Sequence, residues 1–511
     1  MHSLRSFAVV AGLVLLCASS AFADDGNALK AKHVAYTGWQ FGSDAVSSLD
    51  ITETITRDSD AKVLRTEHWK SIGALFRQDT AEKQSAENFS TGFTGNVFWR
   101  SDASGFTVPL IGKVDKYILA SDLVFTDAVT ALPWIVRGSS TVDGTACTIV
   151  HVEQQNSLPI DLCVDPASGA YKRVTIGPGT DYETTFDVLA YGEVTAGRRI
   201  ITRYKYEGST ATHTVTAMSA NDVTTGELHP PVQTAAWDFS NPKPFPIELS
   251  PHRIVVNATV NGVQGKFMLD TGASEIFFSR EFAAKAHLKS AGSFEAHGIV
   301  SALDVQTARV DSLTVGGNTL HNVMVAYGGD VLDPAVPDGQ LGFSLLAGAD
   351  VTLDVSNQTM QIQPPGTLDL TKIPGVRVGV DLVSGQPSVP MKLDDTIDVD
   401  ATIDSGNPQE VLISPDLATK YGLKMLVDPS LAGYFSSHRG MRGIGANYEV
   451  VECGHIDEME LGPIHYTYVG ACKSPSFSGR AALVSLDFLR NFDTIYFAYP
   501  RATMVLVPPK S

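Results

Sequence analysis

The sequence has 511 residues, of which 43% are hydrophobic and 18% are charged. Such a chain is too long for one ordinary hydrophobic core, and its apolar content suits two or three folded domains better than a disordered protein. Its formal net charge of −18 repels the phosphate backbone of nucleic acids. We therefore expect no nucleic-acid partner.

The first 23 residues have the pattern of a secretory signal peptide. An apolar run at 7–16 follows a single basic residue, and Ala21 and Ala23 provide the small residues of a cleavage site. The run is shorter than the roughly 20 apolar residues that a membrane-spanning helix needs. We expect an exported protein, periplasmic or secreted, with no integral membrane segment after cleavage near Asp24.

Four cysteines remain beyond the predicted signal peptide, and they form two local pairs in the sequence. Cys147 and Cys163 flank one probable hairpin, which would put the two cysteines opposite each other. Cys453 and Cys472 flank another hairpin, whose turn contains Gly462. Metal binding is the rival explanation, but the spacings match no CxxC or clustered Cys/His motif. Because disulfides persist in exported proteins, we predict one disulfide in each pair and no metal site.

Turn residues and short apolar runs divide the chain into a mainly β protein with three parts. Residues 24–236 alternate apolar and polar runs and predict a β-rich N-terminal domain. Four prolines within 237–251 predict a linker. A second Pro/Gly-rich stretch then separates two C-terminal lobes, at 252–366 and 367–511.

The two C-terminal lobes repeat a common pattern. Met268–Leu288 and Thr402–Leu423 share an Asp-hydroxyl-Gly turn after apolar residues, followed by an apolar triplet, a serine and a short helix. Ser279 and Ser414 fit the N-caps of those helices. A later block agrees as well, so that Asp350 of the first lobe corresponds to Asp493 of the second.

The repeated turns read Asp270-Thr271-Gly272 and Asp404-Ser405-Gly406. A single turn of this kind is common at strand ends, but two in matching contexts resemble the signature of retropepsin-like and pepsin-like aspartic proteases. The resemblance covers about Pro244 to Pro508. It implies two β-barrel lobes related by a pseudo-two-fold axis, with both aspartates meeting at the lobe interface. Since both lobes lie in one chain, we expect a monomer to complete the site.

The resemblance implies an aspartic endopeptidase whose catalytic residues are Asp270 and Asp404, with a polypeptide substrate and no cofactor. Two carboxylates about 4 Å apart repel by roughly 4 kcal/mol at an effective dielectric near 20, or about three pKa units. Such a pair holds one proton and titrates as a unit. The ionised partner can then activate a water molecule while the protonated partner donates to the substrate carbonyl.

The family pattern also implies supporting roles. Thr271 and Ser405 occupy the position whose hydroxyl bonds across the lobe interface, and Gly272 and Gly406 the position that allows close backbone approach. Flap hairpins are expected over the site. Their candidate glycines are Gly298 in the first lobe and Gly443 and Gly445 in the second.

Two positions depart from the pattern. Asn407 follows the second motif where a small residue is usual, and Val484-Ser485 replaces the apolar-glycine pair that lobe one keeps as Leu341-Gly342. These departures leave open an alternative function, in which inactive lobes bind peptides or lipophilic ligands. A serine hydrolase or metalloenzyme is disfavoured, because the sequence contains no nucleophile elbow and its thirteen histidines have no ligand spacing.

The N-terminal domain has no motif of its own. Its run of amphipathic strands is similar to the periplasmic lipoprotein-carrier fold, which shelters an apolar ligand. A plain β-domain that covers or positions the protease lobes is an equal alternative.

Overall fold

The computed structural model describes most of the chain, and the predicted signal peptide lies outside the described residues. The described ranges are 25–43, 46–82, 88–180, 182–195, 197–250, 253–297, 302–329, 337–382, 385–407, 411–421, 440–442, 448–450, 452–474 and 482–509. Within these ranges, none of the helices has the length and apolar character needed to span a membrane. The protein is mainly β, as the sequence predicts.

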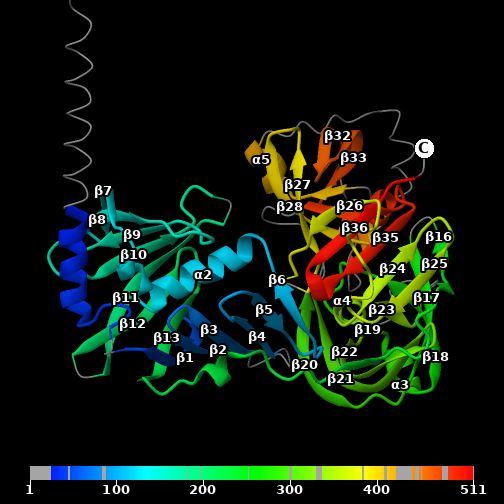
Figure 1. Cartoon of the computed structure of the whole chain (residues 1–511), viewed down its shortest axis with the longest axis horizontal. Coiled ribbons are helices and arrows are strands. Elements are labelled where there is room, and N and C mark those ends of the chain that lie inside the picture. Colours follow the sequence, from blue (N-terminus) through cyan, green and yellow to red (C-terminus); the bar gives the residue numbers. More distant parts are fainter. Residues whose placement is uncertain are drawn as a thin grey trace, which may run out of the picture. The chain divides into compact units, whose positions relative to one another are not determined.

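The chain divides into two compact units (Figure 1). Unit 1 contains 1–83, 90–98 and 113–229, and unit 2 contains 84–89, 99–112 and 230–511. The second unit therefore takes a piece of the N-terminal half of the sequence, which the sequence analysis did not foresee.

Unit 1 is built on one antiparallel sheet. Neighbouring strands run in the order β4-β3-β2-β1-β13-β12-β11-β10-β9-β8-β7. Their bounds are β1 (Ser48–Arg57), β2 (Val63–Ile72), β3 (Leu75–Glu82), β4 (Asn88–Phe93), β7 (Ile135–Val142), β8 (Thr145–Val152), β9 (Ile160–Val164), β10 (Tyr171–Ile176), β11 (Thr184–Thr195), β12 (Arg198–Tyr206) and β13 (Ala211–Ala220). Buried and part-exposed residues alternate along β1, as expected for a strand with one face toward a core.

Helices cover part of this sheet. Helix α2 (Lys113–Phe125) buries Leu119 and Leu123 in the same core cluster as Leu162 and Phe186 of the sheet, and Figure 1 shows it crossing the sheet face. A further helix occupies 25–37, and two short 3₁₀ helices are η1 (Ala128–Ala131) and η2 (Thr225–Leu228).

Unit 2 contains the two lobes, each a ring of six strands. In lobe one the ring is β17 (Arg253–Val260), β18 (Val263–Leu269), β23 (Gly339–Leu341), β19 (Phe277–Phe278), β22 (Asn318–Tyr327) and β21 (Ala302–Val315), with β20 (Ser290–His297) paired to β21. In lobe two the closed barrel is β27 (Ser388–Leu393), β28 (Ile397–Asp404), β34 (Ala482–Ser485), β29 (Val411–Ile413), β33 (Ile464–Lys473) and β32 (Glu452–Leu461).

The two rings have the same strand order and the same directions. The strand that carries the first motif, β18, is parallel to β23, while β19 is antiparallel to β23. The strand that carries the second motif, β28, is likewise parallel to β34, while β29 is antiparallel to β34. The short helices also correspond: α3 (Arg280–Lys285) to α5 (Pro415–Tyr421), and α4 (Phe343–Ala347) to α7 (Leu486–Leu489). The sequence repeat therefore corresponds to two lobes with the same strand order, strand directions and helix positions.

A six-stranded sheet joins the lobes. Its order is β15-β25-β24-β35-β36-β26, and its central pair joins β24 of lobe one to β35 of lobe two with Leu353 opposite Ile495. The strands are β15 (Phe245–Pro246), β24 (Asp350–Asp354), β25 (Thr359–Gln363), β26 (Val376–Gly379), β35 (Thr494–Ala498) and β36 (Thr503–Val507), the last two joined by η3 (Tyr499–Arg501). Arg501 donates to the buried carboxylate of Asp350 at 2.8 Å and adds a charged link between the lobes.

The sequence predicts a linker over 237–251, but its described residues, 237–250, contribute strands to unit 2. They carry β14 (Ala236–Asp238), β15 and β16 (Glu248–Ser250), which pair with β22, β25 and β17 respectively. Pro246 is tolerated in β15 because β15 lies at the end of its sheet, where a missing N–H costs no ladder bond.

The inserted segment 99–112 belongs to the core of unit 2. Its strand β6 (Thr107–Leu110) follows Phe106, and Phe106 and Val108 are buried in the same cluster as the strands of both lobes. The carbonyl of Gly105 accepts the N–H groups of Thr234 and Ala235. Unit 2 is therefore incomplete without residues from before position 113.

Both predicted cysteine pairs are bonded. Cys453 and Cys472 face each other directly in the β32–β33 ladder, with Cα atoms 4.0 Å apart. Cys147 and Cys163 are bonded with Cα atoms 5.4 Å apart, but the register places Ile149 opposite Cys163. The expectation that this first pair lies directly opposite across its hairpin was wrong, and the bond runs diagonally.

Unit 1 also encloses a carboxyl group with an unusual environment. Asp122 of α2 is 1% exposed, and neither of its carboxyl oxygens has a hydrogen-bond partner among the described residues. It lines a cavity of about 20 Å³, together with Glu53, Trp69 and Tyr204. Burial raises the pKa of Asp122 well above its usual value.

We expect Phe106→Ala to destabilise unit 2 although the residue lies far from the lobes in sequence. Removing a buried phenylalanine side chain costs about 3–5 kcal/mol of unfolding free energy. The measurement is chemical denaturation of the full chain. Val232→Ala is the control, because Val232 is 91% exposed and its truncation should change stability by less than about 0.5 kcal/mol. Equal stability of both variants would show that the segment is not part of the core.

We expect Asp122→Asn to weaken the pH dependence of the stability of unit 1. A carboxyl whose pKa is raised on folding stabilises the fold below its unfolded pKa of about 3.9, and that stability is lost as pH rises through the folded pKa. Asparagine cannot ionise, so the variant should lose less stability than the wild type between about pH 4 and 8. The test is denaturant unfolding of both proteins across this pH range, with Asp60→Asn, at an exposed aspartate, as the control. If the unfolding free energies of wild type and Asp122→Asn changed in parallel with pH, the prediction would be contradicted.

Candidate active site

Asp270 and Asp404 lie at equivalent places in the two lobes. Asp270 directly follows β18, and its N–H donates to Leu341 O of the parallel strand β23 at 3.0 Å. Asp404 ends β28, where it stands opposite Ser485 of the parallel strand β34. Because the two rings have the same topology, each lobe delivers its aspartate to the edge that faces the other lobe.

The structure brings the two carboxyl groups within hydrogen-bonding reach of each other. Each is held by the backbone of its own turn: Gly272 N–H donates to Asp270 Oδ1 at 2.9 Å, and Gly406 N–H to Asp404 Oδ1 at 2.8 Å. Asp270 is 9% exposed and Asp404 is 8% exposed. The pair is thus largely shielded and symmetrically oriented.

Each glycine lies beneath the carboxyl group of the other lobe. A Cβ atom on Gly272 would lie 2.3 Å from Cγ of Asp404, and one on Gly406 would lie 2.5 Å from Cγ of Asp270. Nonbonded carbon atoms do not approach that closely, so any side chain at either position would push the aspartates apart. Close approach is therefore the physical reason for glycine in both motifs.

The hydroxyl groups of Thr271 and Ser405 lock the two turns together with four hydrogen bonds. Thr271 Oγ1 donates to Ile403 O at 2.7 Å and accepts Ser405 N–H at 3.0 Å. Ser405 Oγ donates to Leu269 O at 2.8 Å and accepts Thr271 N–H at 3.0 Å. Both side chains are buried, with exposures of 0% and 1%. The arrangement is the cross-interface bonding expected from the resemblance.

The environment favours one shared proton on the carboxyl pair. Burial, followed by the charge of Asp404, raises the pKa of Asp270 well above its usual value. Burial also raises the pKa of Asp404, but the hydrogen bonds from Asp270 and from the backbone N–H groups of Gly406 and Asn407 oppose this rise. The two carboxyl groups titrate as one unit, so neither role belongs to a fixed residue. The pair can therefore supply one acid and one base at the same time.

Gln386 is a contact of this site that the sequence analysis missed. It lies just before β27 of lobe two, and its side-chain amide donates to the carbonyl of Gly272 in the turn of lobe one. The neighbouring Pro387 carbonyl accepts the N–H of Ile403, which precedes Asp404. Gln386 belongs to no repeated motif, so only its place in the fold reveals it.

The two departures from the family pattern fit locally. Ser485 is fully buried at the position of Gly342, and its Oγ accepts the N–H of Asp487 at the start of α7. Asn407 keeps the backbone bond that Ala273 makes in lobe one, because its carbonyl accepts Leu486 N–H at 3.2 Å. Neither residue breaks the bond between Gly406 and Asp404.

Lobe one could not accept the same serine. A Cβ atom on Gly342 would lie 2.1 Å from the carbonyl oxygen of Glu275. The sequence of lobe two is one residue longer in this region, since Asp404 and Ser414 are ten positions apart whereas Asp270 and Ser279 are nine.

Paired strands flank the predicted flap glycines in the sequence of each lobe. In lobe one β20 pairs with the first half of β21, with His297 opposite Ala302, and in lobe two β30 (Gly440–Arg442) pairs with β31 (Tyr448–Val450). The predicted flap glycines Gly298, Gly443 and Gly445 all fall outside the described residues.

Comparison with known proteins agrees with this geometry. Residues 256–345 match the family model described as aspartyl protease. The C-terminal part is retropepsin-like. A retropepsin-like aspartic protease from Rickettsia conorii is 24% identical, over 25% of this chain and 93% of that one, with a TM-score of 0.20. The search of curated proteins found no match.

The N-terminal part of the chain has a different set of neighbours. A LolA superfamily protein from Nitrosomonas europaea is 11% identical, over 40% of this chain and 97% of that one, with a TM-score of 0.31. A DUF1329 family protein from Desulfovibrio piger is 11% identical, over 41% and 97%, with a TM-score of 0.29. These neighbours match the resemblance to the lipoprotein-carrier fold noted in the sequence.

We expect exchanging the residues at the equivalent positions 342 and 485 to change the free energy of unfolding unequally. Gly342→Ser should cost about 2–4 kcal/mol of unfolding free energy, because its Cβ meets a backbone oxygen that cannot easily move. Ser485→Gly should cost less than about 1 kcal/mol, since glycine is tolerated at helix N-caps. Denaturant unfolding of both variants measures this. Equal costs would mean that the two turns are packed alike, contrary to the structure.

Proposed function

We propose that this protein is an aspartic endopeptidase that hydrolyses peptide bonds of polypeptides outside the cytoplasm. The observation that carries the proposal is the buried, proton-sharing pair of Asp270 and Asp404. It is supported by the cross-interface bonds of Thr271 and Ser405. When two carboxyl groups lie this close, their mutual repulsion pushes their two pKa values apart. One group can then be protonated while the other is ionised, as acid–base catalysis needs.

In the proposed reaction, the ionised carboxylate takes a proton from a water molecule lying between the two groups. The resulting hydroxide adds to the carbonyl carbon of the scissile peptide, while the protonated carboxyl donates its proton to the carbonyl oxygen. The tetrahedral intermediate then collapses. Its C–N bond breaks as the nitrogen takes the proton that the first carboxylate accepted, and a hydroxyl group of the intermediate returns a proton to the other carboxylate. This leaves an acid, an amine and a pair with one proton.

One chain supplies both half-sites, so the proposed active form is a monomer. The hairpins β20–β21 and β30–β31 are the proposed flaps over the substrate. An exported location follows from the predicted signal peptide and is consistent with two disulfides. The proposed reaction uses no cofactor, since both the acid and the base come from the chain.

A binding protein without hydrolytic activity is the second candidate. The sequence departures at Asn407 and Ser485 favoured it, but the local fit of both residues weakens that argument. A folded wild-type protein that binds peptides without cleaving them would support this candidate.

We expect either Asp270→Asn or Asp404→Asn to abolish hydrolysis of a denatured protein substrate. Asparagine keeps the size of the side chain but cannot share a proton, so the double variant should be scarcely worse than either single one. Folding should survive, because a buried like-charge interaction is removed. The test is cleavage of denatured casein, monitored from about pH 3 to 8 with and without a statine inhibitor.

Activity should fall at both ends of that pH range. As pH falls, the ionised partner gains a proton and the base is lost; as pH rises through the raised pKa of Asp270, the shared proton and the acid are lost. Glu281→Asn, on the exposed surface of α3, is the control and should leave cleavage unchanged. Wild-type protein that is folded yet cleaves nothing across the range would overturn the proposal.

A further inference from the structure

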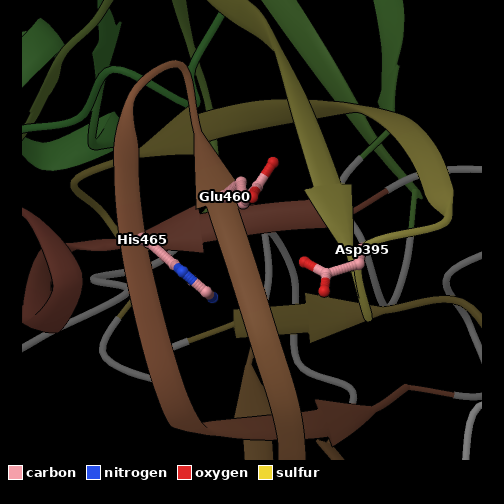
Figure 2. A group of neighbouring side chains, drawn as sticks. All are labelled: Asp395, Glu460 and His465. Atoms are coloured by element: carbon pink, nitrogen blue, oxygen red, sulfur yellow. The ribbon is translucent and has the colours of Figure 1, made fainter.

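A second group of chemically capable side chains lies on the outer surface of lobe two. Asp395 lies in the turn between β27 and β28, whereas Glu460 and His465 lie on β32 and β33 and pair directly across that hairpin. Figure 2 shows the imidazole of His465 and the carboxylate of Asp395 directed toward the space between them, with Glu460 on the adjacent strand. The flanking residues Met459 and Leu461 are buried in the barrel, so the group faces outward.

The ligand atoms of these three residues lie close enough for one metal ion. One oxygen of each carboxylate and one imidazole nitrogen all lie within 4.8 Å of one another. For three atoms so spaced, there is a point no more than about 2.8 Å from all of them, and zinc bonds to nitrogen or oxygen are about 2.0–2.2 Å. Since Asp395 and His465 are exposed, small side-chain rotations close this gap of less than about 1 Å.

Negative charge is concentrated around the group. Asp394 precedes Asp395, and Glu458 carries a carboxylate oxygen 3.7 Å from Nε2 of His465. The nearby cation is Lys392, which stands opposite Glu460 in the β27–β32 ladder. Asp394, Asp395, Glu458 and Glu460 therefore gather their carboxylates at this end of the hairpin beside Lys392, and a divalent cation would relieve the mutual repulsion of the carboxylates.

We propose that Asp395, Glu460 and His465 form a zinc-binding site, with Glu458 available as a further ligand. Imidazole together with carboxylates is a ligand set that suits zinc, whereas calcium and magnesium take oxygen ligands. The sequence predicts no metal site, because 65 positions separate Asp395 from Glu460 and no local spacing reveals the group.

The site is structural rather than catalytic. Asp395 precedes β28 and Asp404 ends it, so the two lie at opposite ends of the strand, roughly 23 Å apart at about 3.3 Å per residue. The bound ion would fasten the turn end of the β32–β33 hairpin to the β27–β28 turn. The disulfide of Cys453 and Cys472 already fastens the open end of the same hairpin.

The test is titration of the EDTA-treated mature chain with zinc chloride, followed by calorimetry and by the unfolding temperature. We expect one saturable zinc per chain and a higher unfolding temperature with zinc. Calcium or magnesium chloride should give neither effect. His465→Asn and Glu460→Gln should each weaken zinc binding at least tenfold, and Lys392→Met should strengthen it, because a repelling cation is removed.

His321→Asn is the matched control, because His321 is an exposed histidine on a strand of lobe one and should not affect binding. Zinc binding that is unchanged in His465→Asn and Glu460→Gln would overturn the proposal, as would the absence of saturable binding to the wild type. The readout does not depend on proteolysis, so it stands or fails separately from the proposed peptidase activity.

Discussion

Four hydrogen bonds between the turns of Thr271 and Ser405 are the constraint on which the site depends. Each hydroxyl both donates and accepts across the lobe interface, so neither turn can move without leaving buried polar groups unpaired, at about 1–3 kcal/mol each. The bonds bring Gly272 beneath Asp404 and Gly406 beneath Asp270. A rigid frame of this kind is required to hold two mutually repelling carboxyl groups together.

The rest of unit 2 reinforces that frame. The six-stranded sheet pairs β24 with β35 across the lobes, and Arg501 bonds to Asp350, the first residue of β24. Core residues of both lobes, together with Phe106 and Val108 from the inserted segment, belong to one continuous cluster. The lobes are thus a single folding unit in which the interface is core rather than contact surface.

Symmetry between the lobes is close but incomplete, and the differences lie beside the carboxyl pair. Gln386 bonds to the turn of lobe one, and Ser485 replaces the glycine behind the turn of lobe two. These asymmetries give the two aspartates unequal surroundings, although the bonds to Gly272 and Gly406 are nearly identical. Unequal surroundings suit a pair in which one member holds the proton and the other the charge.

The sequence by itself determined the features that depend on local pattern. The paired motifs, the helix caps at Ser279 and Ser414, the β-rich class and both cysteine pairs follow from neighbouring residues, because turns, caps and strand periodicity are short-range properties. Tertiary structure alone decided the rest. The strand pairing within 237–250, the packing of Phe106 in the core of unit 2, the bond of Gln386 to Gly272 and the closeness of Asp395 to His465 all involve residues far apart in the chain. Only the packing of the whole fold sets such distances.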